Sequence, residues 1–159
     1  MHKVYLLLGS NMGDSKAYLE KAAREIKQHI GRILRASSLY QTAAWGNTRQ
    51  HDFLNQVLVT ESRLSAPELM KTILLVEKKL GRVRKRKNAP RTIDIDILFY
   101  DKDLINEPEL QVPHPQIPNR RFVLTPLNEL SPQFIHPVAK KTIHYLLRVC
   151  ADPLAVKKI

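Results

Sequence analysis

Two aspartates separated by one residue are the side chains in this sequence best suited to do chemistry. They lie in the segment Ile93-Asp94-Ile95-Asp96-Ile97. In a β-strand, residues two apart share a face, so the isoleucines are predicted to enter the core and Asp94 and Asp96 to project together from the other side, with Cα atoms about 6.6 Å apart. Two carboxylates that face one space repel each other unless a cation lies beside them. Mg²⁺ suits such a pair, because it takes one or two carboxylates, keeps water molecules and completes its shell with substrate phosphates.

A strongly basic segment comes directly before this pair. Residues 78–91 include eight Lys or Arg side chains and no acidic one. Guanidinium and ammonium groups bind triphosphate oxygens, and metal ions held by the aspartates would bridge those same oxygens. Taken separately, the basic run could be a solvated loop and the acidic pair an exposed strand face. Together they predict phosphoryl transfer, and the sequence contains neither a Walker pattern nor G-x-G-x-x-G, so we expect no P-loop and no Rossmann turn.

The composition is that of a globular protein with anionic ligands. The 159 residues carry a formal net charge of +11, which predicts nucleic acid, an anionic membrane or phosphorylated small molecules as ligands. No apolar run approaches the ~18 residues of a membrane span, and the first residues lack a signal-peptide pattern. The single cysteine, Cys150, allows no internal disulfide. We therefore expect one domain over residues 1–159, located in the cytoplasm.

The elements that would position these residues follow from apolar periodicity and from capping residues. Strands are predicted at residues 4–8, 33–42, 52–61 and 92–100, the last with strict alternation. One helix is predicted to begin at Asp14 or Ser15 and to end at Gly31. A second begins at the capping box of Ser65 and Glu68 and ends at Gly81.

The order of these elements predicts the fold class. It runs strand–helix–strand–strand–helix–strand, with a loop at residues 43–51, a turn-rich segment at 101–116, and short helices near 122–130 and 142–150. This order predicts an α+β fold with a ferredoxin-like βαββαβ core, in which a four-stranded antiparallel sheet carries two helices on one face. The short C-terminal helices would follow that core.

Several segments, taken in order, resemble the 6-hydroxymethyl-7,8-dihydropterin pyrophosphokinases of the folate pathway. Residues 81–98 are similar to the signature of that family, and the agreement covers nearly the whole chain. The further matching segments are 9–11, 40–42, 52–55, 112–114 and 119–122. The resemblance implies Mg²⁺-dependent transfer of diphosphate from ATP to the hydroxymethyl group of the pterin, with release of AMP. Its implied partners are these small molecules, with no nucleic acid, membrane or obligate protein partner.

The resemblance also implies roles for individual residues. Asp94 and Asp96 would bind two Mg²⁺ ions, and Arg82 and Arg91 would hold the phosphates and act in catalysis. The further implied ligands are Lys85 and His114 for ATP, and Thr42, Trp45, Phe53, Asn55, Arg120 and Phe122 for the pterin. Stacking of Phe53 and Phe122 on both sides of the pterin gives orientation as well as burial. Asn55 shares a strand face with Phe53 and offers both a donor and an acceptor to the ring edge, and Trp45 lies in a segment expected to act as a lid.

The sequence departs from the family pattern at several positions, and some of its features allow other interpretations. Residues 87–89 read Lys-Asn-Ala where the family often has tryptophan, residues 43–44 are alanines where prolines are usual, and Glu109 replaces a basic residue of some relatives. His114 could be a turn residue and Phe122 a core residue. Among other classes of protein, ferredoxin-like sheets with basic loops are common in RNA-binding modules. Two acids on the last strand would repel RNA phosphates. A purely structural role would not explain the acids and the arginines.

Overall fold

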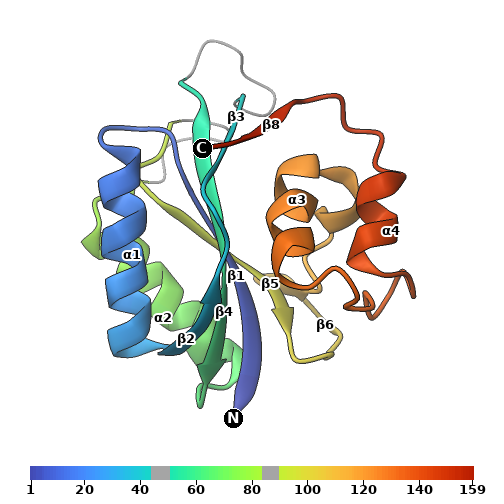
Figure 1. Ribbon diagram of the computed structural model, residues 1–159. Coiled ribbons are helices and arrows are strands. Elements are labelled where there is room, and N and C mark those ends of the chain that lie inside the picture. Colours follow the sequence, from blue (N-terminus) through green and yellow to red (C-terminus); the bar gives the residue numbers. More distant parts are fainter. Residues whose placement is uncertain (44–50, 84–89) are drawn as a thin grey trace.

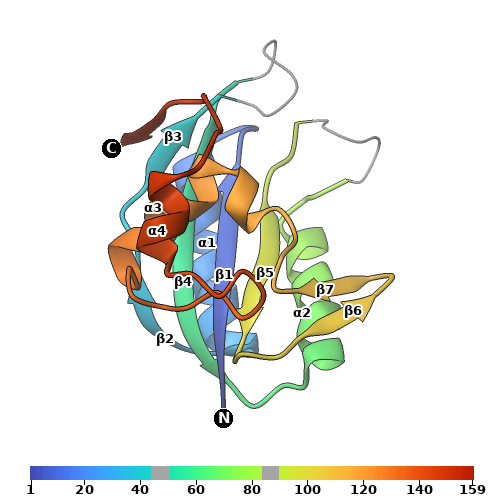
Figure 2. The ribbon, with the colours of Figure 1, turned by 90° about the vertical axis from the view of Figure 1, so that its right-hand side faces the viewer.

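The computed structural model describes residues 1–43, 51–83 and 90–159, and these residues form a sheet with helices on both faces (Figure 1). The elements are β1 (His2–Ser10), α1 (Ser15–His29), β2 (Gly31–Ala36), β3 (Tyr40–Thr42), β4 (Phe53–Ser62), α2 (Ala66–Lys79), β5 (Asp94–Tyr100), β6 (Ile105–Glu107), β7 (Leu110–Val112), a 3-10 turn (Ile117–Asn119), α3 (Arg121–Leu130), α4 (Ile143–Arg148) and β8 (Val156–Lys158). Helices α1 and α2 cover one face of the sheet, and α3 and α4 lie against the other (Figures 1 and 2). Helices α3 and α4 confirm the two short helices expected in the C-terminal part.

Within the described residues, six strands form the main sheet, so the expected four-strand count is wrong. The order is β5–β1–β4–β3–β8, with β2 also paired to β4, and all these pairs are antiparallel. The predicted strand 33–42 is divided into β2 and β3. At the division, the backbone N–H of Ser37 donates to the Val57 carbonyl at 2.9 Å, and the Ser37 hydroxyl accepts the Val57 N–H at 2.9 Å. A side chain therefore replaces the backbone acceptor, and the regular ladder stops there.

The predicted helix ends are largely confirmed. Asp14 caps α1 by accepting a backbone N–H of the first turn at 3.1 Å. At α2, the Ser65 hydroxyl accepts the Glu68 N–H at 3.3 Å and the Glu68 carboxylate accepts the Ser65 N–H at 2.9 Å, which completes the capping box. Gly81 has a φ of 87°, the left-handed conformation that ends many helices.

Gly31 follows α1 as predicted, but for a different physical reason. It begins β2, and a Cβ atom at this position would lie 1.8 Å from the carbonyl oxygen of Glu61 on β4. Glycine is thus required by the close approach of two strands.

The two faces of the sheet bury separate hydrophobic cores. Under α1 and α2 lie, among others, Leu6, Leu8, Ile26, Ile73, Ile95 and Ile97. Under α3 and α4 lie Tyr5, Leu7, Val57, Phe99, Leu124 and Leu127. Alternation along β5 therefore turns the isoleucines toward α1 and α2, as predicted, and directs the two aspartates to the side of α3.

A β-bulge interrupts the alternation of β5. The pairing of β5 with β1 skips Leu98, which is the extra residue of the bulge. As a result, Leu98 and Phe99 both enter the core under α3 and α4, whereas Tyr100 enters the core under α1 and α2. The strict alternation predicted for this strand holds as far as Leu98 and is wrong from Phe99 onward.

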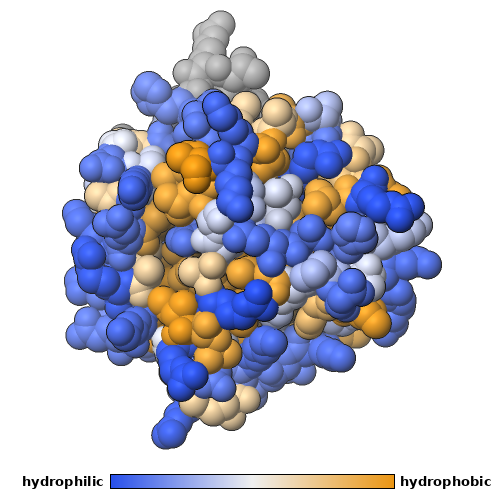
Figure 3. Space-filling model, in the orientation of Figure 1, coloured by the Kyte–Doolittle hydropathy of each residue, from blue (hydrophilic) through white to orange (hydrophobic). Residues whose placement is uncertain are grey.

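Hydrophilic residues cover most of the molecular face shown in Figure 3, and apolar residues gather in smaller areas between them. Across residues 1–43, 51–83 and 90–159, no helix combines the length and the apolar composition that crossing a membrane requires.

Candidate active site

The site is built on adjacent positions of three central strands. Asn55 of β4, Gly9 of β1 and Asp94 of β5 lie opposite one another, and in a neighbouring row Asp96 lies opposite Leu7 of β1. Opposite residues of antiparallel strands project from the same face. Asn55 and Asp94 therefore flank Gly9, which has no side chain to fill the space between them.

A pocket opens over these rows and joins most of the predicted residues. Its lining consists of Leu7, Gly9, Thr42, Ala43, Phe53, Asn55, Arg91, Asp94, Asp96, Arg120 and Phe122. The residues predicted for the pterin and those predicted for the metal thus meet in one space. Trp45 and Lys85 fall within 44–50 and 84–89 and lie outside the described residues.

The amide of Asn55 is held in a fixed orientation. Asn55 is 2% exposed, and its Nδ2 donates to the Thr42 hydroxyl at 3.0 Å. Its Oδ1 lies over Gly9, where an added Cβ atom would be 3.0 Å away. Thr42 and Gly9 therefore determine which way this donor and acceptor pair faces.

Charges of both signs surround the two aspartates. Nη1 of Arg82 is 3.7 Å from Oδ1 of Asp94, and Nη1 of Arg91 is 3.8 Å from Oδ2 of the same carboxylate. Burial raises the pKa of Asp96 to about 8, and the charges of Asp94 and Glu77 act in the same direction, while Arg120 and Arg82 oppose it. The two arginines do not offset the burial and the neighbouring acids, so the protonated form of the Asp96 carboxyl is favoured.

The donor set fits Mg²⁺. Over the described parts of the chain, no group of three or more His, Cys, Asp or Glu side chains is arranged to hold a metal by itself. A pair of carboxylates that leaves room for water and phosphate ligands is what Mg²⁺ takes in nucleotide-dependent enzymes. A divalent cation beside Asp96 would also favour the ionised form of this carboxyl.

Glu77 is a buried acid beside this pair, and no role was predicted for it from the sequence. It is 2% exposed on α2, and its Oε2 accepts the backbone N–H of Ile95 at 2.8 Å. This bond fastens β5 to α2 between the two aspartates. The signal in the sequence is that Glu77 follows Ile73 by four residues, which places a carboxylate on the apolar side of the helix.

The two predicted phosphate-binding arginines both lie beside Asp94, but only Arg91 lines the pocket. The Arg82 side chain is 10% exposed, its Nη1 donates to the Ile93 carbonyl at 3.4 Å, and it does not line the pocket. Arg91 does line it, with its guanidinium 5.4 Å from the centre of the Phe53 ring. Arg120 has a similar position 5.8 Å from the centre of the Phe122 ring. Burial lowers the pKa of Arg120, and Asp96 and Asp94 counteract that shift.

His114 lines a neighbouring groove that shares Asp96 with the pocket. The backbone N–H of His114 donates to the carbonyl of the bulge residue Leu98 at 3.0 Å. Its Nδ1 accepts the Gln116 N–H at 3.1 Å, which leaves the proton of the neutral ring on Nε2. Burial, and then the charge of Arg120, lower the pKa of His114, while Asp94 opposes them. The groove is further lined by apolar residues that include Met70, Ile97 and Leu110.

Fold and site together define a class of protein. A sheet that presents paired carboxylates, arginines and a pocket with two aromatic rings is suited to an enzyme that transfers a phosphate-containing group to a flat heterocyclic molecule.

Comparison with known proteins identifies the family. A family model described as "7,8-dihydro-6-hydroxymethylpterin-pyrophosphokinase (HPPK)" matches residues 5–132. This chain belongs to that family of folate-pathway enzymes, as the sequence resemblance implied.

Individual relatives agree with this assignment. The 2-amino-4-hydroxy-6-hydroxymethyldihydropteridine pyrophosphokinase of Aquifex aeolicus is 42% identical over 90% of this chain and 89% of its own length. The protein of the same name from Synechocystis is 38% identical over 92% of this chain and 75% of its own length. Among solved structures, the HPPK-DHPS of Plasmodium falciparum has a TM-score of 0.76 at 17% identity, with 93% of this chain and 43% of that chain covered. This chain thus spans less than half of that solved protein, and the likeness shows the shared fold.

Proposed function

We propose that this chain transfers diphosphate from ATP to the hydroxymethyl oxygen of 6-hydroxymethyl-7,8-dihydropterin and releases AMP. The observation that carries the proposal is the pocket in which Phe53, Phe122 and the fixed amide of Asn55 meet Asp94 and Asp96. It brings a binding site for a flat ring next to the carboxylates that suit a magnesium–phosphate complex.

In this proposal the pterin lies between the two aromatic rings. Phe53 and Phe122 gain stacking contacts with the pterin ring. The buried Asn55 amide, already bonded to Thr42, uses its remaining hydrogen-bonding groups on the ring edge. A site built to bond such groups rejects rings that lack them, because its own buried polar atoms would then be unsatisfied. Trp45, which lies outside the described residues, is proposed as a further pterin contact.

The phosphates of ATP would lie on the side of Arg82 and Arg91. Asp94 and Asp96 would hold Mg²⁺, and we propose two ions, which when bound neutralise phosphate charge and orient the reacting groups. Arg91 is placed to hold a phosphate that approaches Asp94, and Arg82 supports the same side. Lys85, also outside the described residues, is proposed to assist.

The neighbouring groove would hold the rest of the nucleotide. It meets the pocket at Asp96, so a nucleotide in the groove would have its phosphates directed toward the pterin. Nε2–H of His114 is available to donate to a phosphate oxygen, and apolar side chains such as Met70 and Leu110 suit the adenine ring. The chain thereby aligns the two substrates, which converts an encounter in solution into a reaction within one complex. Because the site draws on residues from β1 to α3, we also propose that residues 1–159 form one domain.

The test is to incubate the protein with ATP, Mg²⁺ and the pterin, and to quantify the nucleotides by chromatography. We expect AMP and pterin diphosphate in equal amounts, and no AMP when the pterin is omitted. Formation of ADP, or of AMP at the same rate without pterin, would contradict the proposal. The alternative of an RNA-binding module is not favoured, because Asp94 and Asp96 face the space where RNA would have to lie.

A further inference from the structure

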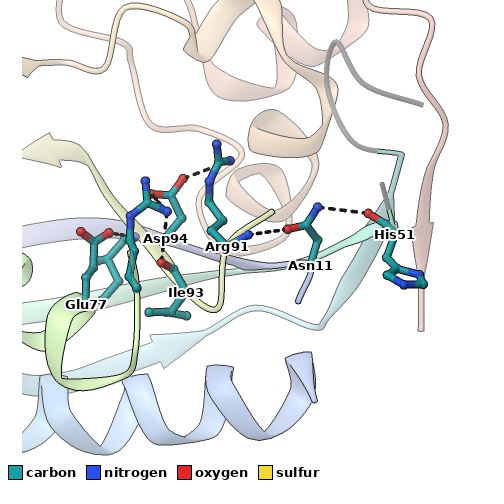
Figure 4. Close-up of polar contacts among 8 residues, drawn as sticks. Asn11, His51, Glu77, Arg91, Ile93 and Asp94 are labelled. Atoms are coloured by element: carbon teal, nitrogen blue, oxygen red, sulfur yellow. Dashed lines mark hydrogen bonds and ion pairs between the residues drawn. The ribbon is translucent and has the colours of Figure 1, made fainter. Parts of the chain in front are cut away.

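Asn11 is a buried polar residue directly after β1, and its role is not explained by the proposed substrate contacts. It is 2% exposed and bonds to two chain segments that are distant in sequence (Figure 4). Its Nδ2 donates to the His51 carbonyl at 3.2 Å. Its Oδ1 accepts the Arg91 N–H at 3.0 Å, and its own backbone N–H donates to the Arg91 carbonyl at 3.2 Å.

The two segments carry opposite sides of the proposed site. His51 precedes Phe53 by two residues at the start of β4, on the pterin side. Arg91 precedes Asp94 by three residues at the start of β5, on the phosphate side. The Arg91 guanidinium spans the two sides, since it lies 5.4 Å from the Phe53 ring centre and 3.8 Å from the Asp94 carboxylate.

The chemistry of the amide explains why asparagine is needed here. One short side chain must accept from an N–H and donate to a carbonyl at the same time, and the amide of asparagine does both. Arg91 has its backbone donor and its backbone acceptor both bonded to Asn11, so the position of its backbone is set from this one residue. Loss of the amide would remove the partner of the Arg91 N–H and of the His51 carbonyl, whose bonds to Asn11 are partly buried, and this costs free energy.

We propose that Asn11 is a positioning residue. It holds the His51–Phe53 segment and the Arg91–Asp94 segment at a fixed separation, so that the two bound substrates are correctly aligned with each other. This inference rests on the proposed function, because the pterin and phosphate sides are assigned there. Asn11 acts through Phe53 and Arg91 and touches neither substrate.

The test uses two variants of Asn11 and a matched control. Asn11→Ala removes both side-chain bonds, whereas Asn11→Asp keeps the acceptor for the Arg91 N–H and loses the donor to His51. Ser10→Ala is the control, because Ser10 is also buried at the end of β1 and its hydroxyl bonds to Ser15, in neither of the two segments. All proteins are compared well below their unfolding temperatures.

The KM values of the two variants distinguish the bond to His51 from the bond to Arg91. With Asn11→Ala, KM should rise about tenfold for both pterin and ATP relative to Ser10→Ala, as expected for loss of two partly buried hydrogen bonds. With Asn11→Asp, the pterin KM should rise by a similar factor while the ATP KM changes less than about threefold. The proposal is overturned if both KM values of Asn11→Ala stay within twofold of the control. It is equally overturned if Asn11→Asp raises the ATP KM as much as the pterin KM, and this outcome decides the matter if Asn11→Ala does not fold.

Amide hydrogen exchange at Arg91 provides a readout that does not depend on activity. The Arg91 N–H should be protected in the wild type, in Ser10→Ala and in Asn11→Asp, and should exchange at least tenfold faster in Asn11→Ala. Equal protection in Asn11→Ala would overturn the proposal. If the wild type itself formed no AMP, the proposed function would fail, and the exchange result would still decide whether Asn11 fixes Arg91.

Discussion

At the scale of single residues, the pocket depends on an absent side chain as well as on those present. Gly9 lies between Asn55 and Asp94 in one row of the sheet, and a Cβ atom there would be 3.0 Å from Asn55 Oδ1 and 3.6 Å from Phe53 Cδ1. We predict that Gly9→Ala displaces the amide and the ring together and raises the pterin KM about tenfold, equivalent to ~1.4 kcal/mol. The ATP KM should change little, because the added Cβ atom would meet Asn55 and Phe53 and would not meet Asp94. Steady-state kinetics with each substrate varied in turn will check this, and an unchanged pterin KM would show that Asn55 and Phe53 do not bind the ring.

Asp94 and Asp96 should be essential for turnover without being essential for folding. Replacing either with Ala removes a proposed metal ligand and should lower kcat roughly a thousandfold, since metal stabilisation of the transferred phosphates contributes several kcal/mol. Both variants should remain folded, because the two aspartates line the pocket and the isoleucines beside them form the core. The exposed Asp103→Ala serves as a control for the loss of a carboxylate. Near-native kcat at saturating Mg²⁺ in either variant would refute the metal assignment.

At the scale of elements, the connection between α3 and α4 contains a histidine that should make stability depend on pH. His136 is 4% exposed, and its Nδ1 accepts the backbone N–H groups of Val138 and Ala139 at 3.1 and 3.0 Å. Burial lowers its pKa below the ordinary value of 6.5. The folded state therefore binds this proton less readily than the unfolded state, so the stabilisation is complete above about pH 6.5 and is lost as the pH falls below it.

Replacing His136 with Asn isolates this effect. The amide oxygen can accept the same N–H groups but does not titrate in this range. Between pH 7.5 and pH 5.5, the unfolding temperature should fall further for the wild type than for His136→Asn. The lowered pKa of His114 acts in the same direction in both proteins and cancels in the comparison. Parallel decreases in the two proteins would show that His136 is not the group responsible.

The parts of the fold that could be predicted from sequence are those in which each residue type allows one placement. Alternation of isoleucine and aspartate assigned the faces of residues 93–97, and the capping box located the start of α2. The bulge could not be predicted, because residues 97–100 are all apolar and either face of the sheet buries them equally well. Strand β8 has three residues, two of them lysines, and forms by pairing with β3, which lies more than 100 residues earlier. Neither periodicity nor local propensity carries that information.

For the site, sequence patterns led to the acids and the basic segment, and the family resemblance supplied the pterin residues. Thr42, Arg120 and Phe122 have no spacing that connects them with Asp94, and it is the fold that brings them together. Glu77 had a usable signal in its helical position. Asn11 belongs to a segment that matched the family, but its bonds to His51 and Arg91 depend on tertiary structure.

At the scale of the whole molecule, the net charge of +11 should favour the anionic substrate over the neutral one. Screening shortens the range of this attraction, from about 10 Å at 0.1 M salt to about 3 Å at 1 M. We predict that raising KCl from about 0.05 to 0.5 M at saturating Mg²⁺ increases the ATP KM several-fold and leaves the pterin KM nearly constant. Kinetics at matched salt concentrations will test this. Equal salt dependence for both substrates would mean that the charge affects the enzyme generally rather than attracting ATP.

The bulge at Leu98 has a consequence for how related sequences should be compared. On both sides of the bulge, alternate residues of β5 face opposite sides of the sheet, but the bulge exchanges the two sides. Before it, the even-numbered Asp94 and Asp96 face α3, and after it the even-numbered Tyr100 faces α1 and α2. Substitutions in this strand leave the alternation before and after the bulge unchanged. Deletion of one residue between Asp94 and Ile97 would instead turn a carboxylate into the core, even though the composition of the strand would hardly change. In alignments of relatives, a gap is therefore compatible with the site if it falls at the bulge, and a gap placed among the aspartates marks an alignment error or a lost activity.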